Sequence, residues 1–321
     1  MEVVLARLDV EDVVRCKSVC KSWYNLISSN DFVKAHLKHS YISNREHGFL
    51  RIRLHWIPNN NAANLRNCLM VGSCNGLVCI SPNPGEFLVT NPSTREVKNL
   101  PNLGYNDNRR KVCCWGFGYD YTNDDYKVVV GFSESKDHVG FQVLSLISDK
   151  WIFDGDCHYL TYNTNANPDA SANDLLCGIL YDGALHWFMD DTKKKKSVIL
   201  SFDLSLEKFK EIPQPDDDVY LCDNRTLLVT FEEHLCIVRS YYIHDRYYRY
   251  CQTIWVMRNY NCWQMLPHDY NGDMYAITAY TLDCFPDNTW RLCDYQKLNI
   301  CYSITSPIFV KSLVSPYPCV D

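Results

Sequence analysis

Three short patterns in the sequence combine residue types that could do chemistry. Residues 72–76 read Gly-Ser-Cys-Asn-Gly, which imitates the turn that presents a cysteine nucleophile between two glycines. His186, next to Trp187, has the side chain of a general base, and Cys157 with His158 offers two ligand types that zinc prefers. The chemistry to be weighed is therefore nucleophilic catalysis, proton transfer or metal binding.

The elements around these residues favour structural roles instead. A nucleophile elbow needs a strand-to-helix turn, whereas a second β-rich run follows Gly76, and Asn75-Gly76 is a preferred pair for a two-residue hairpin. His186 alternates with apolar neighbours, which indicates a satisfied core or surface histidine, and Cys157 and His158 have no partner ligands at metal spacing. We therefore expect no catalytic residues, no metal and no cofactor, in a protein that is not an enzyme.

Composition and charge exclude several further classes. The 321 residues are 46% hydrophobic and 22% charged, which is typical of globular proteins and not of disordered or fibrous chains. The net charge of −6 argues against nucleic acid as a partner, and no apolar run approaches the roughly 20 residues that span a membrane. The 17 cysteines include no C-x-x-C pair, which indicates buried thiols in a reducing compartment. We expect a cytoplasmic and/or nuclear protein with no nucleic-acid and no membrane partner.

The first 40 residues have the period of amphipathic helices. Their apolar residues recur mainly at spacings of three and four: Val4, Leu5, Leu8, Val10, Val13, Val14, Val19, Trp23, Leu26 and Ile27. Asp9 can cap a helix that begins after it, so the first helix is expected to end near Leu8. The pattern breaks at residues 28–30. It predicts three short helices before the break and one further short helix over residues 31–39.

From residue 47 onward the period becomes two, which is typical of β-strands. Four segments share a strand, turn, strand layout, and their apolar anchors lie 54, 58 and 54 residues apart: Val97, Trp151, Phe209 and Trp263. A second set of hairpins lies between them, so each repeat holds four antiparallel strands. Units of about this size are typical of kelch-type propeller blades, of which the chain accommodates five or six. Residues 48–57 and 300–312 would pair to close the ring.

These motifs resemble a known family. Residues 4–23 resemble an F-box, the helical module that docks on the Skp-family adaptor of cullin-RING ubiquitin ligases. The body resembles the F-box-associated interaction domain of plant F-box/kelch-repeat proteins, whose pattern fits residues 72–77, 91–95, 116–120, 183–187, 254–257 and 312–316. The resemblance implies an α+β fold with a helical F-box-like module at residues 1–44 and an all-β kelch-like propeller at residues 45–321.

The resemblance also implies a function. The chain would be the substrate-recognition subunit of a Skp–cullin–F-box ubiquitin ligase, with the adaptor and the cullin scaffold as partners and an unidentified target protein on the propeller. The alternative is a propeller scaffold or ligand-binding protein outside a ubiquitin ligase. Adaptor binding is expected from apolar residues that fit both the F-box pattern and the helical period: Leu5, Leu8, Val13, Val14, Val19 and Trp23.

The start of the head departs from the family pattern. F-boxes usually have a segment like Leu-Pro-x-Glu-Leu before the first helix, whereas this sequence begins at Met1-Glu2-Val3 with residues that already fit that helix. The expectation is an F-box whose first helix is shortened and whose adaptor affinity is lower than that of a full F-box.

The target site is expected on long loops at one face of the propeller. In a four-stranded blade, the loops between second and third strands lie opposite the two short turns, and binding residues concentrate on such loops. Residues 245–250 combine arginine and tyrosine, the types enriched at interface hot spots. We predict target binding by Arg246, Tyr247, Tyr248 and Arg249, with an ordinary aromatic hairpin as the alternative.

Overall fold

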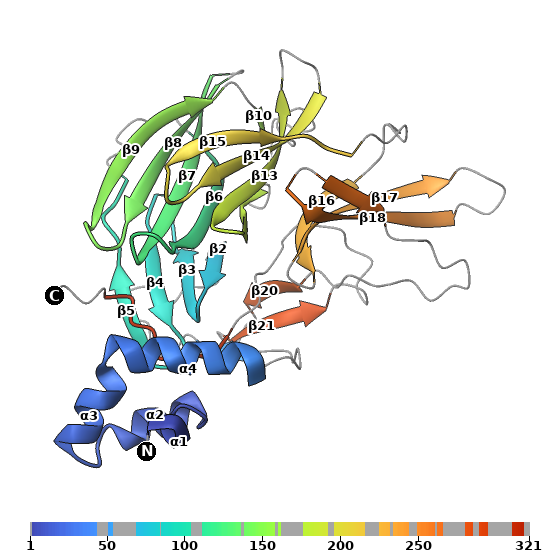
Figure 1. Ribbon diagram of the computed structural model, residues 1–321. Coiled ribbons are helices and arrows are strands. Elements are labelled where there is room, and N and C mark those ends of the chain that lie inside the picture. The colour runs from blue at the N-terminus through green and yellow to red at the C-terminus, as the bar shows by residue number, and fades with distance from the viewer. Residues whose placement is uncertain are drawn as a thin grey trace.

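The computed structural model places four helices at one end of a series of β-sheets (Figure 1). The residues it describes are 2–43, 51–53, 69–83, 85–103, 111–135, 138–157, 160–161, 176–191, 196–215, 225–231, 234–243, 249–260, 262–265, 280–284, 289–294 and 310–317. The predicted order of short helices followed by a β-rich body is confirmed.

The helical head consists of α1 (Glu2–Leu5), α2 (Val10–Cys16), α3 (Lys21–Ser28) and α4 (Asn30–Ser43). Asp9 is the N-cap residue of α2 as predicted, but its side chain makes no capping hydrogen bond, so that part of the prediction is wrong. The fourth helix is also longer than predicted. Phe32, His36 and Ser40 are buried at intervals of four, so the packed face of α4 extends past His39 to Ser40.

Four sheets of the body follow each other along the chain. The first blade is β2 (Leu69–Cys74), β3 (Leu77–Ser81), β4 (Leu88–Asn91) and β5 (Glu96–Asn99). The second is β6 (Lys111–Asp120), β7 (Asp125–Ser135), β8 (His138–Ser145) and β9 (Lys150–Cys157), with β11 (Leu176–Cys177) parallel to β6. The third is β12 (Ile179–Tyr181), β13 (Ala184–Asp191), β14 (Lys196–Asp203) and β15 (Lys208–Ile212), with β10 (Leu160–Thr161) on β13. The fourth is β16 (Arg225–Phe231), β17 (His234–Ile243), β18 (Arg249–Asn259) and β19 (Cys262–Met265).

A fifth sheet joins two distant parts of the chain. It consists of β1 (Arg51–Arg53), β21 (Thr289–Asp294) and β20 (Tyr280–Cys284), with Ile52 opposite Trp290. The start of the body therefore pairs with a strand near the C-terminus, as a closing contact requires. The predicted partner is the segment 300–312: its residues 310–312 form no strand, so that part of the prediction is wrong, whereas residues 300–309 lie outside the described part of the chain and their pairing stays a prediction. Five sheets are present among the described residues.

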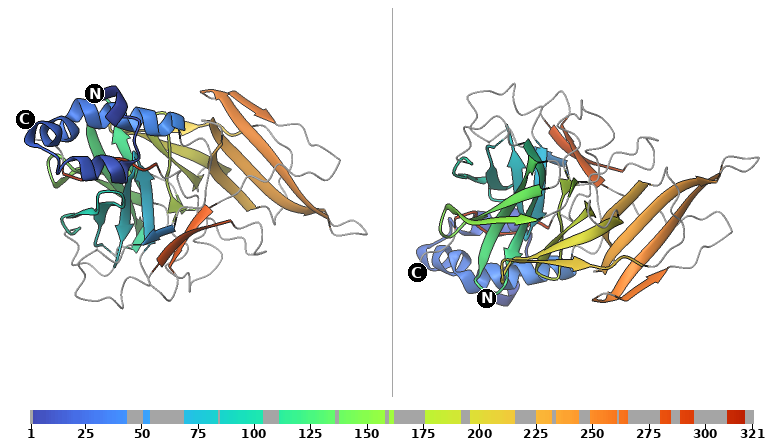
Figure 2. Two further views of the ribbon diagram at one scale, coloured as in Figure 1. Left: turned by 90° about the horizontal axis from the view of Figure 1, so that it is seen from below. Right: turned by 90° about the horizontal axis from the view of Figure 1, so that it is seen from above.

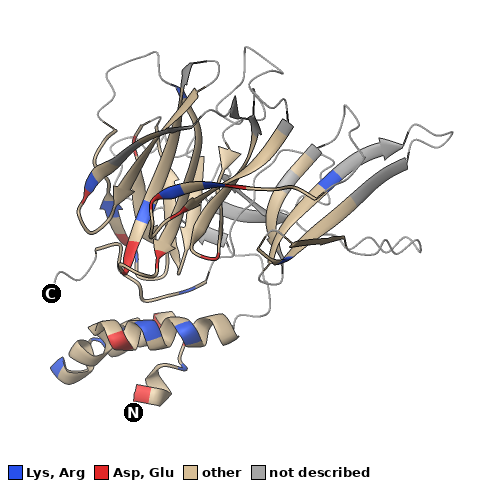
Figure 3. Cartoon of the chain, turned by 45° about the horizontal axis from the view of Figure 1, so that its top comes forward, with Lys and Arg blue, Asp and Glu red and all other residues tan. Residues whose placement is uncertain are grey.

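Consecutive blades are packed face to face. Each of three buried clusters combines residues of two neighbouring sheets: Leu77 and Val89 with Phe117 and Val130, Val129 and Phe141 with Leu185 and Phe202, and Ile199 and Ile212 with Leu228 and Ile237. Burial of one such side chain contributes about 1.5–3 kcal/mol. Most of the strand length carries no charged residue (Figure 3). The apolar alternation of the sequence therefore holds the blades together.

The turns between third and fourth strands share one geometry in the first three blades. In each, the fifth residue has a positive φ and donates its N–H to the carbonyl of the first residue: Arg95 to Asn91, Asp149 to Ser145, and Glu207 to Asp203. The side-chain oxygen of the first residue also accepts a hydrogen bond from a backbone N–H inside the turn. This capping explains why short polar side chains occupy that position.

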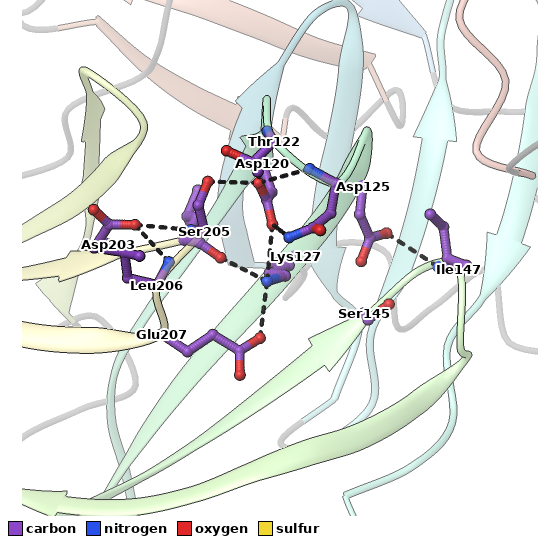
Figure 4. Close-up of polar contacts among 12 residues, drawn as sticks. Asp120, Thr122, Asp125, Lys127, Ser145, Ile147, Asp203, Ser205, Leu206 and Glu207 are labelled. Atoms are coloured by element: carbon purple, nitrogen blue, oxygen red, sulfur yellow. Dashed lines mark hydrogen bonds and ion pairs between the residues drawn. The ribbon is translucent and has the colours of Figure 1, made fainter.

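A buried lysine ties the second blade to the third. Lys127 Nζ lies 2.6 Å from the carbonyl oxygen of Leu204, 2.8 Å from Glu207 Oε1 and 3.0 Å from Asp120 Oδ2 (Figure 4). Burial alone would raise the pKa of Asp120, but hydrogen bonds from Ser205, Asn123 and Lys127 outweigh it and hold that pKa well below its usual range. The blades are therefore joined by charge as well as by apolar packing.

Candidate functional site

The cysteine motif at residues 72–76 is a hairpin. Asn75 and Gly76 form the turn between β2 and β3 with φ values of 52° and 81°, as the hairpin prediction requires. Cys74 is buried beside this turn, and burial raises the pKa of its thiol to about 12. A thiol with that pKa is protonated at neutral pH, so Cys74 is not an activated nucleophile.

His186 is a core histidine. Its side chain is completely buried, and burial lowers its pKa to about 4. Nδ1 lies 3.2 Å from the carbonyl oxygen of Ile179, which can only accept, so Nδ1 carries the proton and Nε2 accepts from the Ser201 hydroxyl at 3.1 Å. Both nitrogens are satisfied inside the third blade, which confirms the core alternative for this residue.

The pair that the sequence analysis considered and rejected as zinc ligands is Cys157, at the end of β9, and His158, which lies outside the described residues. Among the residues that the structure describes, no group of three His, Cys, Asp or Glu side chains could hold a metal ion. Within the same residues, no helix is long and apolar enough to cross a membrane.

The head has a small apolar core of its own. It combines residues of all four helices with one residue from near the C-terminus: Leu5, Val10, Val13, Ile27, Phe32 and Leu313. Two of the residues predicted to bind the adaptor, Leu5 and Val13, are 3% and 0% exposed and belong to this core. A partner protein cannot reach them in this structure, so they support the surface of the head without forming it.

The remaining predicted adaptor residues lie at or near the surface. Leu8 and Val19 are exposed, at 36% and 62%, whereas Val14 and Trp23 are half-buried against the core. The structure also exposes apolar side chains that the sequence analysis did not select: Val3, Val4 and Tyr24. Val4 belongs to the periodic apolar set of the first 40 residues, and that is the signal that could have identified it. Short helices that expose several large apolar side chains are typical of a docking surface.

The head covers the turn face of the first two blades, as the view from below shows (Figure 2). Tyr41 Oη donates to Asn75 Oδ1 at 3.0 Å in the turn between β2 and β3, and Lys34 Nζ lies 2.7 Å from Asp124 Oδ2 in the turn between β6 and β7. Val33 and Leu37 of α4 pack against the core between those blades. The opposite face, where second strands connect to third strands, is therefore the face remote from the head.

Of the four residues predicted to bind the target, the structure describes only Arg249. Arg246, Tyr247 and Tyr248 lie outside the described residues. Arg249 begins β18 and pairs with Ile243 of β17, at the end of the ladder remote from the turn between β18 and β19. Target binding by these four residues stays a prediction.

Comparisons with known proteins match both parts of the chain. The F-box domain matches residues 1–35, and the F-box associated beta propeller domain matches residues 33–272, which is most of the chain. The chain belongs to the F-box-associated β-propeller family. The predicted fold class, a short helical F-box followed by a β-propeller, is thereby confirmed. The predicted boundary between residues 44 and 45 stays a prediction.

Several curated relatives of this F-box protein are proteins of Arabidopsis thaliana. F-box protein CPR1 of Arabidopsis thaliana is 27% identical over 300 residues, which are 80% of this chain and 68% of that protein. Putative F-box protein At3g16210 of the same plant is 28% identical over 227 residues, 66% of this chain and 58% of that protein. F-box/kelch-repeat protein At3g23880 is 25% identical over 244 residues, 67% of this chain and 64% of that protein. The chain therefore spans about two thirds or less of the length of these relatives.

Proposed function

We propose that this chain is the target-recognition subunit of a Skp–cullin–F-box ubiquitin ligase. The observation that carries the proposal is an F-box head packed on the turn face of an F-box-associated propeller. In this role the head binds a Skp-family adaptor, the adaptor links to the cullin scaffold, and the propeller binds a target protein. The chain itself makes and breaks no bond, and it acts in the cytoplasm and/or the nucleus.

The exposed apolar side chains of the helices α1 to α3 and of their connections support the adaptor part of this proposal. Leu8 and Val19 are the accessible members of the predicted set, and we propose that they contact the adaptor together with the half-buried Val14 and Trp23. Leu5 and Val13 hold the helices in place from inside. When a partner covers apolar surface of this kind, its removal from water contributes about 25 cal/mol per Å² to the free energy of binding.

The arrangement of the two faces supports the target part. The head lies on the turn face of the first two blades, so the face where second strands connect to third strands is remote from it. These connections are shorter than the sequence analysis expected, since β7 ends at Ser135 and β8 begins at His138, but connections of this kind often carry binding residues. We propose that the target docks there, with Arg246, Tyr247, Tyr248 and Arg249 as candidate contacts. Tyrosine and arginine provide large contact area and several hydrogen-bond donors.

Affinity purification of the full chain from plant cells, followed by mass spectrometry, tests the proposal. Wild-type protein should recover a Skp-family adaptor and a cullin together with candidate targets. The variant Leu8→Asp Val19→Asp should recover the targets but not the adaptor or the cullin, because it places a charge at each of two exposed apolar positions of the head. Leu206→Asp, on an exposed turn of the third blade, is the matched control. Recovery of targets by wild-type protein without adaptor and cullin would instead favour a scaffold or ligand-binding protein.

A further inference from the structure

A segment near the C-terminus lies between the head and the first blade (Figure 1). We call residues 310–317 the C-terminal clasp. Its Leu313 is 4% exposed and completes the core of the head, whereas the next residue, Val314, is 9% exposed and belongs to the core of the first two blades. Lys311 Nζ lies 2.6 Å from Glu11 Oε1 on α2. Within two residues, the clasp therefore contributes to both apolar cores.

The clasp is held by the two turns of the first blade. Asn91 Nδ2 donates to two clasp carbonyls, Ser312 O at 2.9 Å and Val314 O at 2.7 Å. Ser312 Oγ donates to the carbonyl oxygen of Asn75 at 2.6 Å. Asn91 and Ser312 are both fully buried, so these hydrogen bonds are shielded from water and costly to lose.

The third blade has the same turn without a clasp, so it shows which hydrogen bonds the turn itself requires of its first residue. Asp203 occupies the same position of the same turn and accepts hydrogen bonds from the N–H groups of Ser205 and Leu206 through Oδ1. Asn91 Oδ1 does the same in its own turn. The turn thus requires only an acceptor, and the amide donor of Asn91 is used by the clasp.

The glycines of the two blades show the same difference. Gly76 and Gly183 both have positive φ, at 81° and 72°, in equivalent turns between first and second strands. A Cβ atom at Gly183 would meet nothing within 4 Å, whereas one at Gly76 would come within 2.5 Å of the carbonyl oxygen of Val310 and 2.7 Å of Ser312 Cβ. The first blade is therefore shaped to receive the clasp as well as to turn.

We propose that the C-terminal clasp locks the head onto the propeller, and that Asn91 and Gly76 are its receptor residues. With the clasp seated, the head and the first blade share a continuous apolar and hydrogen-bonded contact. With the clasp released, the head loses Leu313 from its core and is held by the contacts of α4 alone. The clasp thus determines whether the head keeps a single position relative to the propeller, whatever partner either part binds.

Hydrogen exchange of the full chain tests the clasp with an isosteric pair of variants. Asn91→Asp keeps the acceptor that the turn needs but removes both donors to the clasp and places a carboxylate against two carbonyls. Protection of backbone amides in α1 and α2 should fall at least about tenfold, while amides of β3 and β7 keep theirs. Asp203→Asn, the reverse exchange in the third blade, should leave the protection of α1 and α2 unchanged.

Two outcomes would overturn the proposal. Unchanged protection of α1 and α2 in Asn91→Asp would show that the clasp does not hold the head. An equal loss of protection in the head and in β3 and β7 would show that Asn91 stabilises the whole chain and does not act on the head through the clasp. Neither readout depends on adaptor binding, so failure of the clasp and failure of the ligase role are distinguishable.

Discussion

The first and third blades contain the same turns with different neighbours. The turns between third and fourth strands have the same backbone hydrogen bond, and the turns between first and second strands both use glycine at positive φ. In the first blade, Asn91 and Gly76 also contact the clasp, whereas the third-blade turn uses Asp203 and leaves Gly183 in open space. The comparison teaches that local hydrogen bonds and conformational preferences determine the backbone of each turn. Asn and Asp both suit that backbone, and the docked clasp determines which of them the turn uses.

The two blades also differ in how they are tied to their neighbours. Lys127 of the second blade extends its ammonium group to Glu207 of the third blade. The same group also contacts the buried Asp120 of its own blade. The first blade holds the clasp through the neutral amide of Asn91. Substitutions and pH should therefore affect the two junctions differently.

Loss of the Lys127 contact should have the largest effect. Lys127→Met leaves the buried carboxylate of Asp120 without its ammonium partner and should lower the free energy of unfolding by about 3–5 kcal/mol. Chemical denaturation of the full chain measures this value. Lys34→Met is the control, because the exposed pair with Asp124 contributes about 1 kcal/mol or less. Equal losses in the two variants would mean that the junction of the second and third blades is not held by charge.

A methyl group should distinguish the two glycines. Gly183→Ala has space for its Cβ, so it carries only the cost of a left-handed conformation, about 1–2 kcal/mol. Gly76→Ala carries that cost and in addition the collision with the clasp, and its loss should be greater by about 1–3 kcal/mol. Thermal unfolding of both variants measures the difference. A smaller loss in Gly76→Ala than in Gly183→Ala would contradict the position of the clasp.

Acid should act on the charged junction. The pKa of Asp120 is lower in the folded chain than the value of about 4 in an unfolded chain, so its stabilisation is complete above about pH 4 and is lost as the pH falls toward the folded pKa. Wild-type protein should therefore lose stability below about pH 4 more steeply than Asp120→Asn. Denaturation midpoints between pH 3 and pH 6 provide the measurement. Parallel curves for the two proteins would exclude Asp120 as a source of acid sensitivity.

The smallest effect is expected at a tryptophan contact that recurs between blades. Trp151 Nε1 donates to the carbonyl oxygen of Pro101 at 3.1 Å, and Trp263 Nε1 donates to that of Pro213 at 2.8 Å. Trp151→Phe and Trp263→Phe remove the donor but keep an aromatic ring. Each should cost about 1 kcal/mol by chemical denaturation. A loss above about 3 kcal/mol in either variant would indicate a packing role that the hydrogen bond does not explain.

The repeat could be predicted from the sequence because its signals are local. Asn75-Gly76 and Asp182-Gly183 fix their turns by conformational preference, and period-two alternation fixes which strand faces are buried. The positive φ of Arg95 and Glu207 could not be predicted in the same way, because neither side chain favours that conformation. Those two residues adopt it because the preceding cap and strand pairing require it.

The clasp and the surface of the head could not be predicted, because they depend on contacts between distant segments. Residues 312–316 fit the family pattern, yet nothing in their local sequence indicates that Leu313 completes the core of α1 to α4. The helical period marks Leu5 and Val19 alike as apolar, but only packing decides that Leu5 is buried and Val19 is exposed. Beyond His39, Ser40 of α4 is buried and Tyr41 donates to Asn75 of the first blade, and both contacts depend on segments distant in the sequence or on packing.

Binding of a purified Skp-family adaptor to the full chain, measured by isothermal titration calorimetry, tests the receptor role most directly. We predict saturable one-to-one binding by the wild type and by Leu206→Asp. Leu8→Asp Val19→Asp, which changes two exposed apolar positions of the head, should bind at least about tenfold more weakly. Circular dichroism should show that all three proteins are folded. No measurable binding by the wild type, or equal binding by all three proteins, would contradict an adaptor-binding head.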